Sequence, residues 1–307
     1  MSIYAGLDIG GTKCALSLGD CSADAVNILH REEFPTAGQG WHAVLEEFVA
    51  RIGRLPRTPE AVGISCGGPL DSRRGLILSP PNLPGWDEVP VVKFLEERLK
   101  IPVRIQNDAN ACAYAEWKFG AGRGTRNMVF MTFGTGLGAG LVLDGRLYAG
   151  TNDNAGEVGH LRLAPEGPVG YNKAGSAEGF CSGAGIARLA AIRARERGLD
   201  IGTPSTKDIF AKVRAGDPFF ADVFRESAAH LGMILSWTID LFNPEAIVLG
   251  GVYMRNADLF EPLIAPVLER EALPLARQVC RIVPAALSEN VGDYAALSVA
   301  AMDVPAS

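Results

Sequence analysis

One aspartate stands where an α/β sheet would place a catalytic base. Val103–Gln106 is predicted to form a strand that runs into Asn107-Asp108, and Ala109–Phe119 has helical character. Open α/β sheets bind ligands at the carboxyl ends of their strands. A carboxylate at this place can take a proton from a bound hydroxyl group as a phosphoryl group arrives. The alternative interpretation is an ordinary helix N-cap, because Asn and Asp are common there.

Two glycine-rich stretches are candidates for holding phosphate through the backbone. Residues 6–13 read GLDIGGTK, and residues 134–140 read GTGLGAG. Each lies between β-rich runs, which predicts a hairpin tip whose N–H groups can point at an anion. Thr12 before Lys13 reverses the Walker order, and Ala139 replaces the third glycine of the dinucleotide-binding fingerprint. The alternative for both stretches is a tight turn that binds nothing.

A third group of polar residues is a candidate for recognising hydroxyl groups. Glu157 and His160 lie in GEVGH, and Glu178 lies in AGSAEG. Carboxylates accept hydrogen bonds from hydroxyl groups, and an imidazole can donate or accept, so these types suit a sugar. The alternative is a purely structural role. Trp86, in the turn NLPGW, is predicted to be exposed, and it could stack on a sugar or serve as a packing residue.

Alternating strand and helix signals predict an α/β fold that positions these residues. Ala61–Cys66 and Ala246–Leu249 are typical of buried strands, and Phe224–Phe242 is typical of a long helix stopped by an Asn-Pro pair. The hairpin pattern restarts at Asn127, and its glycine turn lies roughly 125 residues after the first one. This spacing suggests a duplicated domain.

The domain boundary is expected near residue 120, where the chain is rich in glycine. The prediction is a first α/β domain at 1–120, with the first hairpin and Asp108. A second α/β domain is expected at 121–291, with the second hairpin and its returning strand at Leu141–Leu143. The helix expected at 292–307 is predicted to complete the first domain.

Length and composition indicate a soluble globular enzyme with a sizeable core. The chain has 307 residues, of which 48% are hydrophobic and 21% are charged. Its net charge of −6 argues against nucleic acid or an anionic membrane as a partner. No signal peptide or membrane helix is apparent, and the six cysteines are scattered without a CxxC pair. We therefore expect a cytoplasmic protein with reduced thiols.

Taken together, the motifs resemble those of the ROK family of sugar kinases and repressors. In chain order they are GLDIGGTK, GGP at 67–69, PNLPGW at 81–86, NDANACA at 107–113, GTGLGAG, GEVGH and NPEAIVLGG at 243–251. The resemblance implies an actin-like (ribonuclease H-like) ATPase fold of two α/β domains with an interdomain cleft. It implies a glucokinase-like, ATP-dependent carbohydrate kinase with Mg²⁺ as cofactor and a small sugar as substrate. Family members are often dimers, so a homodimer is compatible with it.

The resemblance also gives roles to individual residues. Asp108 matches the catalytic base of the family. The residues that match ligands of the sugar hydroxyl groups are Gly68, Asn82, Asn107, Asp108, Glu157, His160 and Glu178. The residues that match ligands of the ATP phosphates, of Mg²⁺ and of the adenosine end are Asp8, Gly10, Gly11, Thr12, Lys13, Gly134, Thr135, Gly136, Gly138, Gly250 and Gly251.

One departure from the family pattern concerns zinc. ROK members usually bind a structural zinc through the histidine of the ExGH motif and three cysteines in a CxCGxxGCxE stretch. Here Val169, Tyr171 and Ser176 stand at the cysteine positions. One histidine and one stray cysteine cannot close a tetrahedral site, so we expect no structural zinc. Hydrogen bonds or packing are then expected to orient His160.

The predicted reaction is phosphorylation of a hexose or an N-acetylhexosamine by ATP, with the 6-hydroxyl group as the expected acceptor. The sequence does not name the sugar, and polyphosphate is an alternative donor. The non-enzyme alternatives are a sugar-responsive transcriptional regulator and a catalytically silent sugar sensor. The regulator is disfavoured because the first hairpin starts by residue 3, with no helix-turn-helix before it. The sensor is disfavoured because Asp108 and both hairpins are intact.

Overall fold

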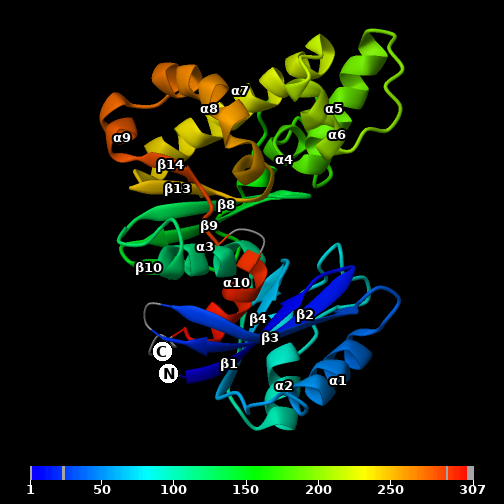
Figure 1. Cartoon of the computed structure of the whole chain (residues 1–307), viewed down its shortest axis with the longest axis vertical. Helices are drawn as coiled ribbons and strands as arrows, with labels where there is room; N and C mark the ends of the chain where they lie inside the picture. The colour runs from blue at the N-terminus through cyan, green and yellow to red at the C-terminus, as the bar shows by residue number, and fades with distance from the viewer. Residues whose placement is uncertain (1, 23–24, 288–289, 303–307) are drawn as a thin grey trace. The chain divides into compact units, whose positions relative to one another are not determined.

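The computed structural model of the chain describes residues 2–22, 25–287 and 290–302. By their internal contacts these residues form two compact units, each an α/β structure (Figure 1). Unit 1 contains the described residues up to Gly124, the segment Leu147–Ala155, and the described residues after position 289. Unit 2 contains Thr125–Arg146 and the chain from Gly156 to residue 287.

The division differs from the predicted boundaries at one segment. The predicted boundary near residue 120 is close to Gly124, but Leu147–Ala155 belongs to unit 1 and not to the second domain. Asp153 fixes this segment to unit 1, because its two carboxylate oxygens accept from the backbone N–H of Ser72 at 2.7 Å and from the Ser72 hydroxyl group at 2.9 Å. Of the helix expected at 292–307, residues 303–307 lie outside the described residues.

Unit 1 is built on a five-stranded mixed sheet in the order β3-β2-β1-β4-β7. The strands are β1 (Ser2–Ile9), β2 (Lys13–Cys21), β3 (Val26–Pro35), β4 (Ala61–Cys66) and β7 (Val103–Asn107). The first three are antiparallel, whereas β1, β4 and β7 run parallel, so their carboxyl ends meet at one edge. Two short strands, β5 (Leu70–Asp71) and β6 (Leu76–Ile77), form a separate ribbon.

Helices cover both faces of this sheet (Figure 1). The helices α1 (Trp41–Ile52) and α2 (Val91–Leu99) pack on the face that carries Leu7 and Ile9. Alternate strand residues point to opposite faces, so Gly6 faces α10 (Val291–Ala300), which packs together with α3 (Asp108–Phe119). An added Cβ on Gly6 would lie 2.9 Å from the backbone nitrogen of Leu297. Helix α10 thus lies so close to the sheet that only a residue without a side chain fits at position 6.

Trp86 is a core residue of unit 1, which corrects its predicted exposure. Only 1% of the residue is accessible to solvent, and it packs in the cluster between the sheet and α1 and α2. The turn before it is closed by a hydrogen bond from the N–H of Trp86 to the carbonyl oxygen of Leu83 at 3.2 Å. Trp86 is therefore a packing residue.

Unit 2 is built on a sheet of the same order, β10-β9-β8-β13-β14. The strands are β8 (Met128–Phe133), β9 (Leu137–Leu143), β10 (Arg146–Tyr148), β13 (Ala246–Leu249) and β14 (Arg281–Pro284). Of β10, only Arg146 is assigned to unit 2, and the rest of the strand is assigned to unit 1. As in unit 1, the first two strands along the chain, β8 and β9, pair antiparallel, whereas β13 pairs parallel with both β8 and β14. The shared topology confirms the predicted duplication.

The returning strand of the second hairpin begins earlier than predicted. It starts at Leu137 and not at Leu141, because Leu137 pairs with Phe133 and Ala139 pairs with Met131 in the antiparallel ladder. The turn is therefore confined to Gly134–Gly136, and the later glycines belong to the strand.

The helices of unit 2 are α4 (Ala177–Phe180), α5 (Gly183–Glu196), α6 (Thr206–Arg214), α7 (Pro218–Phe242), α8 (Gly251–Glu271) and α9 (Pro274–Val279). The long helix α7 starts six residues before the predicted Phe224, because Asp217 caps it. The Asp217 carboxylate accepts from the N–H groups of Phe219 and Phe220 at 3.0 and 3.3 Å. None of the helices in the described part of the chain combines the length and apolar character that a membrane span requires.

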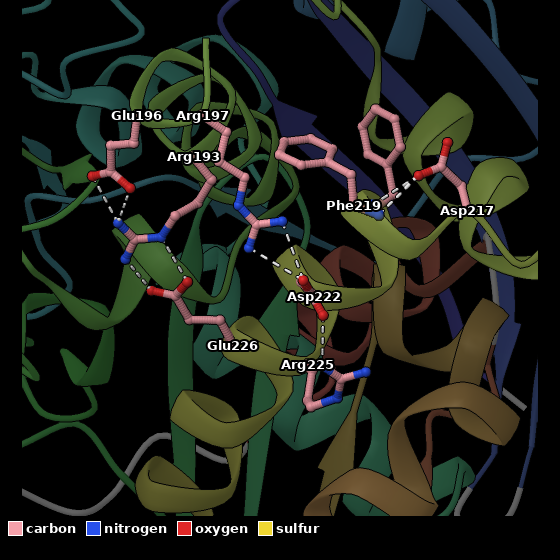
Figure 2. A network of polar contacts seen from close by, with 9 residues as sticks. Arg193, Glu196, Arg197, Asp217, Phe219, Asp222, Arg225 and Glu226 are labelled. Atoms are coloured by element: carbon pink, nitrogen blue, oxygen red, sulfur yellow. Dashed lines mark hydrogen bonds and ion pairs between the residues drawn. The ribbon is translucent and has the colours of Figure 1, made fainter. Parts of the chain in front are cut away.

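An ion-pair network joins α5 to α7 (Figure 2). Arg193 of α5 lies between Glu196 and Glu226, and its Nε donates to Glu226 Oε2 at 2.8 Å. Arg197 donates to Asp222 of α7 at 3.1 Å. Bidentate guanidinium–carboxylate pairs fix geometry better than single contacts do, so the network holds the C-terminal end of α5 in place relative to the first turns of α7.

Candidate active site

The carboxyl edge of the unit 1 sheet brings Asp8, Asn107 and Asp108 to one level. Ile9 of β1 pairs with Cys66 of β4, which in turn pairs with Asn107 of β7. Asp8 lies one residue before the end of β1, and Asp108 directly follows β7. The parallel register is the reason that residues about a hundred positions apart in sequence share this edge.

Asn107, and not Asp108, is the N-cap of α3. The Oδ1 atom of Asn107 accepts from the N–H groups of Ala109 and Asn110 at 3.0 and 3.4 Å. Asp108 is the first helical residue, and its Oδ1 accepts from the Ala109 N–H at 2.7 Å. The side chain of Asp108 is exposed, so it can meet a substrate. Asn107 therefore caps the helix, while its neighbour Asp108 stays the candidate for the catalytic base.

A glycine pair after β4 leaves space among these polar groups. An added Cβ on Gly67 would lie 3.7 Å from both side-chain amide atoms of Asn82 and 4.0 Å from Oδ2 of Asp108. An added Cβ on Gly68 would lie 3.1 Å from Nδ2 of Asn107. Two amides and one carboxylate thus converge around a place without side chains, where they can donate to and accept from hydroxyl groups. Unit 1 therefore brings together its predicted sugar ligands.

Negative charge is concentrated at this edge. Burial, followed by the carboxylates of Asp108 and Asp293, raises the pKa of Asp8 to about 6 against the opposing effect of Lys13 and Arg31. Surrounding protein also raises the pKa of Asp108 by desolvation, against the backbone N–H bonds that lower it, although its outer side is open to solvent. A carboxylate with a raised pKa is a better proton acceptor near neutral pH.

The first hairpin turns tightly at Gly10 and Gly11. The N–H of Gly10 donates to the carbonyl oxygen of Lys13 at 3.2 Å, and a Cβ on Gly11 would overlap the carbonyl oxygen of Asn82. The hairpin therefore lies against the turn that carries Asn82. The carbonyl oxygen of Thr12 accepts from the N–H of Thr36 at 3.0 Å, and Thr12 is exposed.

Lys13 is paired with a carboxylate in this structure. Its Nζ lies 2.7 Å from Oε1 of Glu33, and 63% of the lysine side chain is exposed. Exposed ion pairs contribute about 0–1 kcal/mol, so a phosphate can compete with Glu33 for the ammonium group.

The second hairpin of unit 2 is contacted by two helix starts. The N–H of Gly183, the first residue of α5, donates to the carbonyl oxygen of Gly134 at 2.8 Å. Gly251, the first residue of α8, has a φ of +58° and would overlap the carbonyl oxygen of Phe133 if it carried a Cβ. Helix N-termini favour anions, so Gly250-Gly251 and Gly134 form one predicted phosphate-binding region. The sequence prediction missed Gly183, for which Ser182 as an N-cap was the available signal.

The side chain of Glu178 binds the backbone of the second hairpin. Its Oε2 accepts from the N–H of Leu137 at 3.2 Å, and an added Cβ on Gly136 would lie 2.6 Å from the same oxygen. Glu178 thus connects α4 to the turn that contains Thr135 and Gly136. The neighbouring Gly138 is tied to the other side of the hairpin, because its N–H donates to the Thr132 hydroxyl group at 2.8 Å.

Glu157 and His160 lie at the two ends of a short 3-10 turn, η1 (Val158–His160). Glu157 is its N-cap residue, and both side chains are exposed. Gly159 packs the turn on β9 and α4, because an added Cβ would overlap the carbonyl oxygen of Leu137 and lie 3.4 Å from Cβ of Glu178. Unit 2 therefore brings its three predicted sugar ligands into one neighbourhood.

Comparison with known proteins identifies the family of the chain. The family model described as "ROK family" matches residues 4–302. The chain belongs to the ROK family. A glucokinase of Halalkalibacterium halodurans is 33% identical over 307 residues, with 94% of this chain and 92% of the relative covered. An N-acetylmannosamine kinase of Escherichia fergusonii is 36% identical over 247 residues, with 80% and 81% covered.

The crystal structure of a ROK family glucokinase from Streptomyces griseus in complex with glucose and AMPPNP has a similar fold. The TM-score is 0.80 at 30% identity, and the match covers 97% of this chain and 99% of that one. The two duplicated sheets and this similarity confirm the predicted actin-like ATPase fold, and the predicted ROK membership is confirmed as well.

Proposed function

We propose that this ROK family member is an ATP-dependent carbohydrate kinase that phosphorylates the 6-hydroxyl group of a hexose or N-acetylhexosamine, with Asp108 as general base. The observation that carries the proposal is the exposed Asp108 carboxylate beside Asn82 and Asn107 at the carboxyl edge of the sheet. The glucokinase and N-acetylmannosamine kinase relatives support the substrate class. A cytoplasmic location and a homodimer, as in many family members, belong to the same proposal.

In this mechanism Asp108 accepts the proton of the acceptor hydroxyl group as the phosphoryl group is transferred. Its raised pKa suits this step, since the carboxylate must bind a proton transiently. Asn107 uses Oδ1 to cap α3, so its Nδ2 is the group that donates to a sugar oxygen. Asn82 offers both a donor and an acceptor, and Gly68 leaves the space that the sugar needs.

The residues at the sheet edge fit Mg²⁺ and ATP. The carboxylates of Asp108 and Asp293 raise the pKa of Asp8, so a cation beside Asp8 would be stabilised, and Mg²⁺ is usually held by only one or two carboxylates together with substrate phosphates. Asp8 would hold the metal, and the first hairpin, Gly10 to Lys13, would hold phosphate oxygens. When bound, Mg²⁺ supplies charge stabilisation to the transferring phosphoryl group.

Unit 2 supplies the remaining ligands in this proposal. Glu157, His160 and Glu178 hold sugar hydroxyl groups. The second hairpin binds ATP phosphates through Gly134, Thr135, Gly136 and Gly138, and Gly250-Gly251 lines the adenosine end. The AMPPNP and glucose complex of the Streptomyces griseus relative supports a site for both ligands in this fold.

The test is ADP release by the purified protein with Mg-ATP across a panel of hexoses and N-acetylhexosamines, with Asp108→Asn as the control. Sugar-dependent ADP release that is lost in Asp108→Asn is the expected result, and NMR of the product should show a 6-phosphate. Sugar binding by calorimetry without turnover would instead indicate a sugar sensor or regulator. ADP release that does not depend on sugar would contradict the proposal.

A further inference from the structure

The segment Val169–Glu178 does not fit the zinc that ROK members usually bind. Ser176, at one cysteine position, is fully buried, and its hydroxyl group is already used within the segment. It donates to the carbonyl oxygen of Gly170 at 3.1 Å and accepts from the N–H groups of Gly170 and Gly179, each at 3.1 Å. Across residues 2–22, 25–287 and 290–302, no three His, Cys, Asp or Glu side chains are grouped to hold a metal ion.

The segment instead forms a small β-hairpin. Its strands are β11 (Val169–Gly170) and β12 (Lys173–Ala174), which pair antiparallel. The two turn residues, Tyr171 and Asn172, have φ angles of 46° and 61°. Two successive residues in this left-handed region are typical of a type I′ turn, the common two-residue hairpin connection. Tyr171 and Lys173 are thereby carried on a short and well-defined scaffold.

Both residues contact His160. The Nζ atom of Lys173 lies 2.9 Å from Nδ1 of the imidazole and donates to the carbonyl oxygen of the same residue at 2.7 Å. The ring of Tyr171 packs against the imidazole in an edge arrangement, with 5.7 Å between the ring centroids. Two independent contacts therefore fix the histidine ring.

The contact with Lys173 determines which ring nitrogen carries the proton. An ammonium group has three donors and no acceptor, so Nδ1 must accept the hydrogen bond. The neutral ring then carries its proton on Nε2. His160 is exposed, so this Nε2–H can donate to a ligand.

We propose that Lys173, assisted by Tyr171, replaces the zinc as the group that positions His160 and fixes its Nε2–H tautomer for a sugar oxygen. Lys173 supplies a positive charge and a donor at the imidazole, and the Ser176 hydrogen bonds close the segment that zinc would otherwise close. Lys173 is a positioning residue, because it acts on the sugar through His160. The choice of sugar as ligand rests on the proposed function, whereas the tautomer does not.

The first test measures the tautomer by NMR. The chain has four histidines, so long-range ¹H–¹⁵N spectra at about pH 8 resolve the imidazoles in their neutral state, and His160→Asn assigns the signal. We expect the Nε2–H pattern in the wild type and in Lys173→Arg, which keeps a donor, and an averaged pattern of both tautomers in Lys173→Met. Lys207→Met removes an exposed lysine of α6 in the same unit and should leave the pattern unchanged. An unchanged pattern in Lys173→Met would overturn the proposal.

The second test measures sugar affinity with the sugar that the panel identifies. Loss of a group that orients a metal-binding histidine typically costs about 10- to 100-fold, and we expect the same factor for a histidine that binds sugar. Lys173→Met should therefore raise the sugar KM and Kd by about this factor, with kcat at saturating sugar nearly unchanged, while Lys173→Arg recovers part of the affinity. Equal affinity in Lys173→Met and Lys207→Met would contradict the role of Lys173. If no sugar binds to the wild type, the proposed function fails, and the NMR result still decides the positioning of His160.

A metal analysis completes the test. The purified wild type should contain zinc well below one ion per chain, and incubation with a zinc chelator should leave Tm and the His160 spectrum unchanged. Stoichiometric zinc, or loss of the His160 pattern in chelator, would overturn the proposal.

Discussion

The two glycine hairpins occupy equivalent places in the two sheets but carry different chemistry. Asp8 and Thr132 each lie one residue before the end of the first strand of their sheet, opposite Ala15 and Gly138 respectively. The Asp8 carboxyl group is desolvated, and its pKa is raised to about 6. The Thr132 hydroxyl group is instead satisfied inside its own hairpin by the N–H of Gly138. At equivalent positions of the two duplicated sheets, Asp8 thus places a carboxylate in a negatively charged region, whereas Thr132 leaves the second hairpin neutral.

The same contrast extends to the glycine pairs that follow the fourth strand of each sheet. Gly67-Gly68 follows β4 and leaves open space beside Asn82 and Asp108. Gly250-Gly251 follows β13 and is closed by the backbone of Phe133. The unit 1 pair leaves space that the proposed substrate could occupy, whereas at the unit 2 pair the backbone of Phe133 fills the corresponding space. In the proposed mechanism the acid–base chemistry belongs to unit 1, whereas the glycine pair of unit 2 is tightly packed on its own hairpin.

The largest expected effect is on catalysis at the charged edge. A general base contributes about 10²- to 10⁴-fold, so Asp108→Asn should lower kcat by this factor, or about 3 to 5.5 kcal/mol of barrier. Sugar affinity should change little, because the amide keeps an oxygen for the hydroxyl group. Steady-state kinetics and calorimetry check both quantities. Near-native kcat in this variant would remove Asp108 from the role of base.

The equivalent glycine pairs should respond oppositely to alanine. Gly251→Ala places a side chain at φ +58° and against the Phe133 carbonyl oxygen, so we expect a loss of about 2 to 4 kcal/mol in the free energy of unfolding. Gly67→Ala makes only contacts of 3.7 to 4.0 Å, so it should stay within about 1 kcal/mol in stability while weakening sugar binding. Urea denaturation of both variants decides the matter. Similar stability losses would show that the contrast between the pairs is wrong.

The charge at Asp8 should appear in the pH dependence of stability without Mg²⁺. Its pKa is raised from 3.8 to about 6, so between these values the folded protein binds more protons than the unfolded chain. The contribution of Asp8 to the free energy of unfolding therefore falls as pH rises through this window. Asp8→Asn should remove this fall and gain about 1 to 3 kcal/mol over the wild type at pH 7.

Urea denaturation of the wild type and Asp8→Asn at a series of pH values isolates this contribution, since the other titrating groups cancel in the difference. Added Mg²⁺ should stabilise the wild type more than the variant. A difference between the two proteins that does not vary with pH would show that Asp8 is not desolvated.

The smallest effect is expected at the neutral hairpin. Thr132→Val keeps the shape of the side chain but removes the acceptor for the Gly138 N–H, so stability should fall by about 0.5 to 1.5 kcal/mol. Thr203→Val, at an exposed position of the same unit, is the matched control. Thermal denaturation measures both, and a drop in kcat as large as that of Asp108→Asn would show that the second hairpin takes part in the acid–base chemistry.

The sequence predicted the parts of the site that depend on strand ends and glycine turns. Asp108 was predictable because a strand and a helix meet at Asn107-Asp108, and parallel strands bring such ends together. The contact of Lys173 with His160 was not predictable, since it depends on a turn at Tyr171-Asn172 that no glycine marks. The burial of Trp86 was not predictable either, because the local turn does not show the long-range packing that buries the ring, and the sequence left its role open between stacking on a sugar and packing.

Longer-range contacts were equally out of reach. The assignment of residues 147–155 to unit 1 depends on the hydrogen bonds of Asp153 with Ser72, which are 81 positions apart. The early start of the returning strand depends on its pairing with β8, which alternate glycines conceal. The local sequence pattern therefore predicted which helices and strands form, whereas tertiary contacts determine where they begin and end and to which unit they belong.

The place of α10 in unit 1 imposes an order on folding during synthesis. The sheet strands β1 to β7 leave the ribosome first, yet the face at Gly6 and Gly63 has no covering helix until residues 291–300 have been made. The chain of unit 2, up to residue 287, is complete before that point. The second unit to be translated is thus the first that can finish folding, and the uncovered sheet of the nascent first unit is the surface that a ribosome-associated chaperone would have to shield.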